Sequence, residues 1–379
     1  MNILLAARKI SGKKAGIGNY AYHLIMTLAR LDPDSRYRIF LGARWRPAMR
    51  DGVELFKAAP SNVALSIPKI PSNVFRLLSD AFPAVTGRIL LRDIDLYHET
   101  DNIPLQAPRR TRVVNTIHDM CRFLFPHFDP PNTVQRWETY RETIRGVDRI
   151  ITVSHHSKHD IVELLKVPEE RIRVIYPGLS AVYGILPHDR VSAGLKRLGI
   201  DGPYILFTGT ITPRKNVDQL LRAYVRLTQR RNDVPRLVLA GSKGWKWQPT
   251  FDLMAELKIE SRVQHLGYVS DEDLVVLYNG AEAFVYPSWY EGFGFPPIEA
   301  MACGCPTVVS NSSSLPEVVG DAARLVDPRD DEALAQALED VVFDGGTRTV
   351  LRERGLTRAK MFSWDTTARQ TLDVYHEVR

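Results

Sequence analysis

Residues 287–304 read Pro287-Ser-Trp-Tyr-Glu-Gly-Phe-Gly-Phe-Pro-Pro-Ile-Glu-Ala-Met-Ala-Cys-Gly304, and they follow an apolar run at 283–286 that is typical of a strand. Gly292 and Gly294 lack a Cβ atom, which lets the loop backbone approach a ligand closely. The Pro296-Pro297 pair stands where proline best starts a helix. Free N–H groups and the positive dipole end at a helix start attract anions, so this stretch predicts a phosphate site.

Two carboxylates bracket this predicted site: Glu291 on the loop and Glu299 in the first turn of the helix. A carboxylate repels phosphate, so we expect each to accept hydrogen bonds from hydroxyl groups, such as those of a ribose or a sugar. A bare Glu-x7-Glu spacing more often marks a loop with two solvated glutamates. Here the double proline, the Gly-Phe-Gly-Phe turn and the Gly-Cys-Pro strand start stand in register, which favours the functional interpretation.

The composition is that of a soluble two-domain protein, since the chain has 379 residues, of which 44% are hydrophobic and 25% charged. Arg8 and Lys9 directly follow the apolar run Ile3-Leu-Leu-Ala-Ala7, which favours a first strand over a signal peptide. The sequence shows no run long enough to span a bilayer, so we expect a cytoplasmic protein. The three cysteines fit a reducing compartment because they form no even framework and no metal-ligand spacing: Cys121, Cys303 and Cys305.

Positive charge is concentrated in the first half of the chain. Residues 1–180 contain 27 Lys and Arg against 18 Asp and Glu, a surplus of +9, whereas residues 181–379 contain 23 against 26, or −3. Such a surplus can face nucleic acid, an anionic substrate or an anionic membrane leaflet. Nucleic acid ranks last, because the sequence has neither an aromatic-interleaved basic run nor zinc-finger spacing.

Short apolar runs alternate with helical patterns along the whole chain, which predicts an α/β fold with parallel sheets covered by helices on both faces. We predict a first doubly wound domain at 1–180, a linker at 181–200, a second domain at 201–363 and a helical tail at 364–379. The predicted strands of the first domain are 2–7, 37–42, 95–99, 112–119, 149–154 and 171–177. Those of the second are 204–209, 236–241, 263–268, 283–286, 306–310 and 323–326. Two such sheets with ligand loops on facing edges indicate a cleft enzyme.

Two further segments of the first half follow predicted strands, where parallel sheets bind ligands. Ala15-Gly-Ile-Gly-Asn19 is a glycine-rich turn after the first strand, although Ala21 stands where a dinucleotide motif would have a third glycine. Thr116-Ile-His118-Asp119 ends another strand. A lone histidine is more often structural, but its position at a strand end makes His118 a candidate site residue.

The second half offers a cationic segment in the corresponding place. Thr208-Gly-Thr-Ile-Thr-Pro-Arg214-Lys215-Asn216 follows the first strand of that domain and opens a helix. Arg214 and Lys215 can neutralise two phosphates, the first as a planar fork and the second as a point charge. An isolated Arg-Lys pair is usually only exposed, but the turn at Gly209 favours phosphate binding. Tyr268 and Val269 end another strand and can form the wall of a base pocket through main-chain groups.

The sequence predicts no metal and no other cofactor. His155 and His159 share a helix face, but no carboxylate or cysteine completes a ligand set, and Ser154 is an ordinary helix N-cap. Three Asp-x-Asp strings also occur, and none of them ends a strand at a glycine-rich loop.

Residues 73–92 alternate apolar side chains with Arg76, Arg88 and Arg92 and are interrupted by Pro83. One interpretation is one or two amphipathic helices packed on the first domain. The other is a basic, apolar surface that rests on a membrane carrying a lipid-linked acceptor.

The Glu291…Glu299 block resembles the signature of the retaining glycosyltransferases of family 4, and further segments extend this resemblance over nearly the whole chain except about residues 43–94. The family has the GT-B fold, two tandem Rossmann-like domains facing a central cleft, with a C-terminal helix that packs back on the first domain. The resemblance implies that Glu299 holds the donor ribose and that Arg214 and Lys215 hold the diphosphate. It also implies a role in holding the donor or the transferred sugar for these residues: Gly16, Ile17, Gly18, His118, Gly209, Tyr268, Val269, Glu291, Phe293, Gly294 and Phe295. Catalysis would rest on His118, Glu291, Arg214 and Lys215.

The sequences of residues 290–299 and of Leu315-Pro-Glu317 are most similar to those of bacterial GDP-mannose-dependent mannosyltransferases of polysaccharide or O-antigen assembly. The resemblance therefore implies a metal-independent transfer of mannose to a saccharide on a polyprenyl diphosphate, at the inner face of the cell membrane. A UDP-sugar is the alternative donor, since UDP-sugar-dependent relatives share most of these motif sequences. Less favoured alternatives are a nucleotide-sugar epimerase and a non-catalytic nucleotide-sugar-binding protein.

Overall fold

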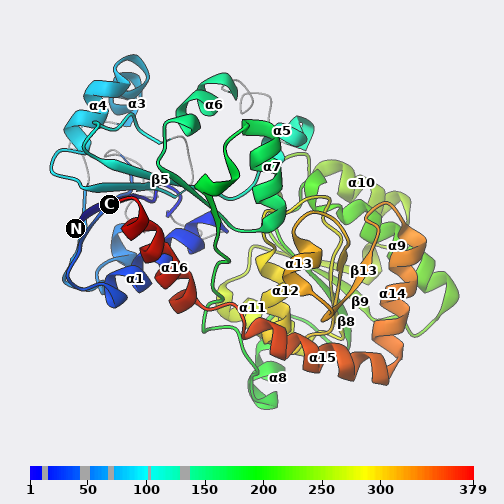
Figure 1. Cartoon of the computed structure of the whole chain (residues 1–379). Coiled ribbons are helices and arrows are strands. Elements are labelled where there is room, and N and C mark those ends of the chain that lie inside the picture. The colour runs from blue at the N-terminus through cyan, green and yellow to red at the C-terminus, as the bar shows by residue number, and fades with distance from the viewer. Residues whose placement is uncertain (11–15, 43–51, 67–71, 101–103, 129–136) are drawn as a thin grey trace. The chain divides into compact units, whose positions relative to one another are not determined.

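The computed structural model describes residues 1–10, 16–42, 52–66, 72–100, 104–128 and 137–379. It divides the chain into two compact units (Figure 1). The first consists of Met1–Met120, Val134–Gly178 and Ser363–Arg379, and the second of Cys121–Thr133 and Leu179–Phe362. Two departures from the predicted domains are that residues 121–133 group with the second unit and that the chain from residue 179 onward already belongs to it.

The first unit is built on a parallel sheet of seven strands in the order β3-β2-β1-β4-β5-β6-β7. Its strands are β1 (Asn2–Ala6), β2 (Arg36–Phe40), β3 (Val63–Leu65), β4 (Leu96–Glu99), β5 (Arg112–Ile117), β6 (Arg149–Thr152) and β7 (Ile172–Val174). Six of these confirm predicted runs. β3 was missed because three residues at the sheet edge are too few to show a pattern.

The helices of the first unit include α1 (Ile17–Leu31), α3 (Ser72–Ala81), α4 (Pro83–Leu90), α6 (Trp137–Arg145), α7 (His155–Leu165) and α16 (Trp364–Glu377), with the short 3₁₀ turn η3 (Glu169–Arg171). α7 begins as predicted, since the Ser154 hydroxyl accepts a hydrogen bond from the Ser157 N–H at 3.0 Å. α16 lies against α1 (Figure 1), and its Tyr375 hydroxyl is 2.6 Å from Nδ1 of the buried His98.

The second unit contains a parallel sheet of six strands in the order β10-β9-β8-β11-β12-β13. The strands are β8 (Tyr204–Thr208), β9 (Arg236–Ala240), β10 (Val263–Gly267), β11 (Ala283–Tyr286), β12 (Thr307–Ser310) and β13 (Ala323–Val326), and all six confirm predicted runs. Nearly every residue of β8, β9, β11 and β12 is buried, as expected for a sheet covered on both faces.

The longer helices of the second unit are α8 (His188–Arg197), α9 (Val217–Arg230), α10 (Gln248–Glu256), α11 (Asp271–Gly280), α12 (Phe295–Ala302), α14 (Asp331–Phe343) and α15 (Gly345–Ala359). Shorter elements are α5 (Cys121–Leu124), α13 (Leu315–Val319), η1 (Pro126–Phe128), η4 (Pro213–Lys215) and η5 (Glu260–Arg262). α9 illustrates the packing, because Leu220, Tyr224 and Leu227 recur every three or four residues and are fully buried. Among the residues described, no helix is both long and apolar enough to cross a bilayer.

The stretch at 181–200, predicted as a linker, is an integral part of the second unit. Its helix α8 packs on α11, where a Cβ atom on Gly194 would lie 2.7 Å from the Val276 side chain. Glycine thus permits the close approach of the two helices. The sequence did not reveal this contact, because a short polar helix looks the same whether it docks on a domain or bridges two.

Both sheets reverse their strand order beside their first strand, with β1 between β2 and β4 and β8 between β9 and β11. Loops that leave neighbouring carboxyl ends at such a switch point run in opposite directions and leave room for a ligand. In the second unit, the loop after β8 leads to Arg214 and Lys215, and the loop after β11 carries Glu291. The topology therefore directs attention to these two loops.

Candidate active site

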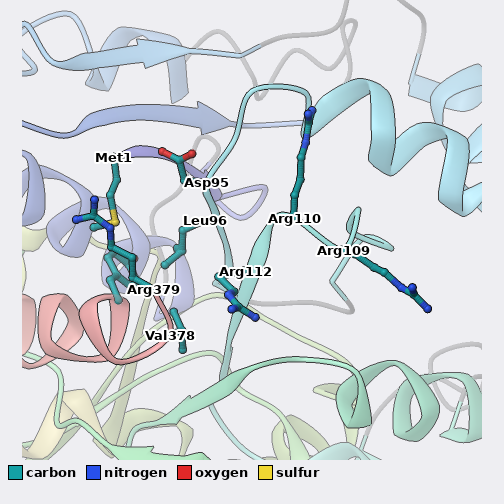
Figure 2. Close-up of a pocket in the computed structure, with 9 residues that line it drawn as sticks. Met1, Asp95, Leu96, Arg109, Arg110, Arg112, Val378 and Arg379 are labelled. Carbon is teal, nitrogen blue, oxygen red and sulfur yellow. The ribbon is translucent and has the colours of Figure 1, made fainter.

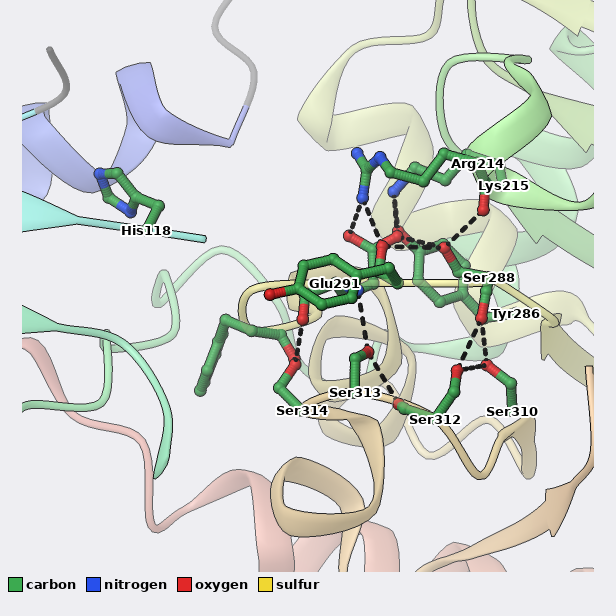
Figure 3. Close-up of polar contacts among 12 residues, drawn as sticks. His118, Arg214, Lys215, Tyr286, Ser288, Glu291, Ser310, Ser312, Ser313 and Ser314 are labelled. Carbon is green, nitrogen blue, oxygen red and sulfur yellow. Dashed lines mark hydrogen bonds and ion pairs between the residues drawn. The ribbon is translucent and has the colours of Figure 1, made fainter. Parts of the chain in front are cut away.

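Arg214, Lys215 and Glu291 form one charged cluster in the second unit (Figure 3). The Arg214 Nη1 atom lies 2.8 Å from Glu291 Oε2, and the Lys215 Nζ atom lies 2.6 Å from Glu291 Oε1. Both the Lys215 and Glu291 side chains are about nine-tenths buried. Three of the four predicted catalytic residues thus meet, although they stand 77 positions apart at the extremes, counted from 214 to 291.

The Glu291 carboxylate is held ionised. Burial by itself would raise its pKa, but the charges of Arg214 and Lys215 outweigh burial and lower the pKa to about 2. Oε1 also lies 2.5 Å from the Ser288 hydroxyl and 3.1 Å from the Tyr286 hydroxyl, and the latter accepts a hydrogen bond from Lys215. Two cations and one carboxylate leave a net charge of about +1 at this place.

The two segments that carry the cluster are tied to each other by backbone hydrogen bonds. The Arg214 carbonyl accepts from the Trp289 N–H at 2.9 Å, and Arg214 Nη1 donates to the Tyr290 carbonyl at 2.7 Å. Asn216 adopts a left-handed conformation with φ of 57°, and its side-chain amide donates to the Pro287 carbonyl at 3.0 Å. The cations therefore cannot move without the loop that carries Glu291.

Serines after β12 brace the same loop from the other side (Figure 3). The Ser313 hydroxyl accepts from the Glu291 N–H at 2.9 Å, and the Ser314 hydroxyl lies within 2.9 Å of the carbonyls of Glu291 and Phe293. Ser310 and Ser312 both donate to the Ser288 carbonyl. Sequence reasoning missed these residues. The available signal was the run Asn311-Ser-Ser-Ser314 at a strand's carboxyl end.

Glycines at the carboxyl ends of β8 and β9 let this edge close. Gly209 has φ of 137°, a conformation that other residues rarely adopt, and a Cβ atom there would lie 3.7 Å from the Lys215 side chain. A Cβ atom on Gly241 would lie only 1.9 Å from the Gly209 carbonyl oxygen. Gly209, which the resemblance placed at the donor site, thus lies beside Lys215.

Helix α12 follows the Glu291 loop as predicted, but it begins at Phe295, so Glu299 is its fifth residue and lies beyond the first turn in which the sequence analysis placed it. Gly294 takes φ of 106° just before it, the proline pair occupies its first turn, and the N-terminal amides follow the Glu291 loop. Glu299 on this helix accepts a hydrogen bond from the Tyr278 hydroxyl at 3.1 Å. Although part of the residue is exposed, burial of its carboxyl group raises the pKa to about 8, so Glu299 is mostly protonated at neutral pH.

The other predicted donor residues of the second unit differ in exposure. The Phe293 ring is buried, with its centroid 5.3 Å from that of Phe295 and 5.4 Å from that of Phe362. Phe295 is the first residue of α12 and is partly exposed. Tyr268 and Val269 directly follow β10, and Tyr268 is 49% exposed.

The remaining predicted residues belong to the first unit. His118 follows β5 directly, and its Nε2 atom lies 2.8 Å from the Thr100 carbonyl oxygen. Because a carbonyl can only accept, Nε2 must carry the hydrogen, which makes Nδ1 the basic nitrogen of the neutral ring. The Tyr20 ring meets the His118 ring edge-on with centroids 4.7 Å apart.

The glycine loop of the first unit opens α1. Ile17 is its first residue, and Gly16 precedes it with φ of 36°. A Cβ atom on Gly18 would lie 2.7 Å from the Lys9 carbonyl oxygen, so glycine is needed there for packing. Ala15, the first residue of the predicted turn, lies outside the described residues. The convergence of this loop and His118 with the cluster of the second unit stays a prediction.

The cavity shown in Figure 2 lies away from these residues, at the opposite edge of the first sheet. It measures about 460 Å³ and is lined at the amino ends of β1, β4 and β5 and at the end of α16, by Met1, Asp95, Leu96, Arg112 and Val378 among others. Arg109, Arg110, Arg112 and Arg379 point in different directions in Figure 2, so they do not converge on one anion.

Within the described part of the chain, no three His, Cys, Asp or Glu side chains gather as a metal site would require. His156 Nε2 lies 3.4 Å from Asp160 Oδ2 along α7. The three cysteines are buried.

Comparison with known proteins identifies both halves of the chain. Residues 15–181 match the family described as Glycosyltransferase Family 4, and residues 196–358 match Glycosyl transferases group 1. The O-antigen chain mannosyltransferase B of Escherichia coli is 34% identical over 386 residues, an alignment that covers 99% of each chain.

Solved structures show the same fold. The Anabaena protein HepE in complex with UDP and glucose superposes with a TM-score of 0.76 at 19% identity over the whole of both chains. Sucrose-phosphate synthase from Thermosynechococcus elongatus gives 0.75 at 21% identity and covers 99% of this chain and 98% of its own. The chain therefore belongs to the glycosyltransferases of family 4, and its two doubly wound units are those of the GT-B fold.

Proposed function

We propose that this glycosyltransferase transfers mannose from GDP-mannose to a lipid-linked saccharide acceptor during cell-surface polysaccharide assembly, with retention of anomeric configuration and without a metal ion. The observation that carries the proposal is the cluster of Arg214 with the buried Lys215 and Glu291 beside the start of α12. The name of the Escherichia coli relative, an O-antigen chain mannosyltransferase, supports mannose and polysaccharide assembly.

The cluster suits the leaving group of such a reaction. Breaking the bond between the anomeric carbon and phosphate places positive charge on the sugar and additional negative charge on the diphosphate. Arg214, Lys215 and the Phe295 N–H at the start of α12 are already oriented, so they stabilise the departing diphosphate without first reorganising, whereas Pro296 and Pro297 have no N–H to donate. In this proposal these side chains do the work that a divalent cation does in metal-dependent enzymes.

Glu291 has the capacity to hold the transferred sugar. Its Oε1 is saturated by Lys215, Tyr286 and Ser288, whereas Oε2 accepts from Arg214 alone among the described residues. A carboxylate oxygen accepts about two hydrogen bonds, so Oε2 can take a further one from a sugar hydroxyl. Such heavy engagement and the low pKa make Glu291 a poor nucleophile, which favours transfer without a covalent Glu291 intermediate.

Arg214→Ala or Lys215→Ala is expected to lower turnover by roughly 10²- to 10³-fold, because each change removes one preorganised charge from the leaving group. The measurement is nucleoside diphosphate release under saturating donor and acceptor. Arg222→Ala on α9 and Lys196→Ala on α8, both exposed, are matched controls that should keep the wild-type rate. A near-normal rate in either cluster variant, with an unchanged melting temperature, contradicts the assignment.

The donor is tested by incubating the protein with GDP-mannose, UDP-glucose, UDP-galactose and UDP-N-acetylglucosamine and measuring the release of nucleoside diphosphate, with and without acceptor. We expect GDP-mannose to give the highest kcat/KM, also in the presence of a chelator. UDP-sugars are the second candidates, because the similar HepE structure holds UDP and glucose. Nuclear magnetic resonance of the product linkage tests retention, for which the α-anomer is expected from the α-linked donor.

The acceptor side of the proposal rests on α3 and α4 of the first unit. Several apolar side chains on these helices are exposed, above all Leu77 at 67% and Ile89 at 70%, with Phe82 and Val85 also more than half exposed. Arg88 lies in the last turn of α4, and the Arg92 side chain that follows is 81% exposed. Apolar side chains beside arginines suit the surface of an anionic membrane leaflet, which would bring the protein to the inner face of the membrane.

A further inference from the structure

One segment of the chain changes units beside the candidate site. β5 and the residues up to Met120 belong to the first unit, whereas Cys121–Thr133 belong to the second. Its described part, residues 121–128, forms α5 and η1, two short helical turns closed by the Phe125 N–H to Cys121 carbonyl bond at 2.7 Å. Three aromatic rings lie in the last four of these residues: Phe125, His127 and Phe128.

Phe125 fixes this segment to the Glu291 loop. Its ring centroid lies 5.5 Å from that of Tyr290, in a tilted arrangement. Tyr290 is buried, precedes Glu291 directly, and accepts a hydrogen bond from Arg214 through its carbonyl group. Phe125 therefore contacts the residue that directly precedes Glu291, so the aromatic segment lies next to the charged cluster.

The two other rings extend from Phe125 towards solvent. Phe128 stacks on Phe125 with centroids 5.4 Å apart and an angle of 27°, and His127 lies 4.4 Å from Phe128. Phe128 is partly exposed and His127 is exposed. Phe125 anchors the turn on Tyr290. The partly exposed Phe128 ring and the exposed His127 ring lie beyond this anchor, next to the Glu291 loop, and indicate a surface that a ligand covers.

Hexose rings match such a surface. A pyranose has an apolar face of C–H groups with partial positive charge, and the face of an aromatic ring carries the negative end of its quadrupole. We propose that Phe128 and His127, held in place by Phe125 on Tyr290, form the subsite for a hexose ring of the acceptor saccharide. The inference rests on the proposed function, since it names the part of the second unit that would receive the acceptor.

The test compares Phe128→Leu with wild type in the full-length protein, using octyl α-mannoside and the corresponding glucoside and galactoside as acceptor probes. The variant should raise the KM for the best acceptor by roughly tenfold, whereas the donor KM should change by less than about twofold. Phe128→Tyr, which keeps the ring, should restore the acceptor KM. Phe251→Leu on α10, another partly exposed phenylalanine, is the matched control and should behave like wild type.

Saturation-transfer nuclear magnetic resonance supplies a second readout, since the acceptor's ring protons should receive saturation from aromatic protons in wild type and less in Phe128→Leu. An unchanged acceptor KM, or donor and acceptor KM rising together, overturns the subsite. So does a wild-type protein that neither uses nor contacts any of the three hexosides. If the proposed function itself is wrong, the result differs: the wild-type protein then releases no nucleoside diphosphate from any donor, with or without an acceptor.

Discussion

Glu291 restrains the cations that it accompanies. Its charge neutralises about half of the positive charge that Arg214 and Lys215 would otherwise direct at a diphosphate. In the proposed reaction this arrangement would help product release, since a fully cationic site would bind the leaving diphosphate too firmly. Glu291 would then serve both sides of the bond that breaks: the sugar through Oε2 and the diphosphate by moderating the charge of the two cations.

Glu291→Gln is expected to tighten nucleoside diphosphate binding by roughly tenfold while it lowers turnover by about 10²-fold or more. The amide keeps the shape but removes the negative charge, so the two cations face the product alone. Titration calorimetry with GDP and steady-state rates measure the two effects. Glu256→Gln, at an exposed position on α10, is the control. Weaker GDP binding in Glu291→Gln would show that the carboxylate does not oppose the diphosphate.

Glu299 is expected to lose a proton when a nucleotide binds. Its pKa of about 8 means that it is mostly protonated at pH 7 before a nucleotide binds. Two ribose hydroxyls that donate to the carboxylate would stabilise the ionised form and lower the pKa. Nucleotide binding would remove little further water from a carboxyl group that protein already surrounds, so additional desolvation would not offset this decrease.

The expected result at pH 7 is the release of about one proton per nucleotide bound, measured by calorimetry in buffers of different ionisation enthalpy. Because binding releases a proton, affinity should rise as the pH increases towards about 8 and level off above it. Glu299→Gln should abolish both effects. Proton uptake, or no exchange at all, would remove Glu299 from the ribose site.

At the scale of elements, the edge formed by β8, β9 and β11 positions the cluster. The loops leaving these strands approach each other so closely that side chains are excluded at specific points, as at Gly241 against the Gly209 carbonyl. The helices then supply directed groups: η4 carries the cations, and α12 contributes its amide end and Glu299. The same close packing at the sheet edge therefore also positions the residues of the candidate site.

Gly241→Ala is expected to lower the free energy of unfolding by roughly 1–3 kcal/mol, because the new methyl group cannot fit 1.9 Å from the Gly209 carbonyl oxygen. Denaturant titration measures the loss, and turnover should fall as well, since the loop to Lys215 must shift. Gly184→Ala in the same unit is the control, as a Cβ atom there meets nothing within 4 Å. Equal stability of the two variants would contradict this account of the edge.

At the scale of the whole molecule, the two units differ in what they offer to solvent. The basic surplus of the sequence lies within residues 1–180, and the exposed apolar face of α3 and α4 belongs to the same unit. The proposed lipid-linked acceptor would require such a surface, because an acceptor of that kind does not leave the membrane. The side chain of Arg76, one of the three arginines noted there, lies outside the described residues.

Val85→Asp on α4 should reduce co-sedimentation with vesicles that contain anionic phospholipid by several-fold, since a charge on the apolar face opposes its insertion. Val350→Asp on α15 is a closely matched control, because the two valines are 53% and 45% exposed on helices of different units. Binding should also weaken with salt and with neutral lipid. Equal sedimentation of both variants would argue against α3 and α4 as the membrane surface.

The sequence by itself determined the fold class and most strands, because buried parallel strands appear in it as uninterrupted apolar runs. It also located the helix that follows the Glu291 loop and singled out Arg214, Lys215, Glu291 and Glu299 as candidates, since glycine, proline and charge at a strand's end have local physical meanings.

Only the tertiary structure decided which groups touch. That Glu291 pairs with both cations, that serines after β12 brace its loop, that α8 packs on α11, and that Phe125 joins the second unit through Tyr290 all depend on contacts between distant segments. Local pattern carries no information on such pairs, because the free energy of a contact belongs to two positions at once, and their distance is fixed only when the sheet has assembled.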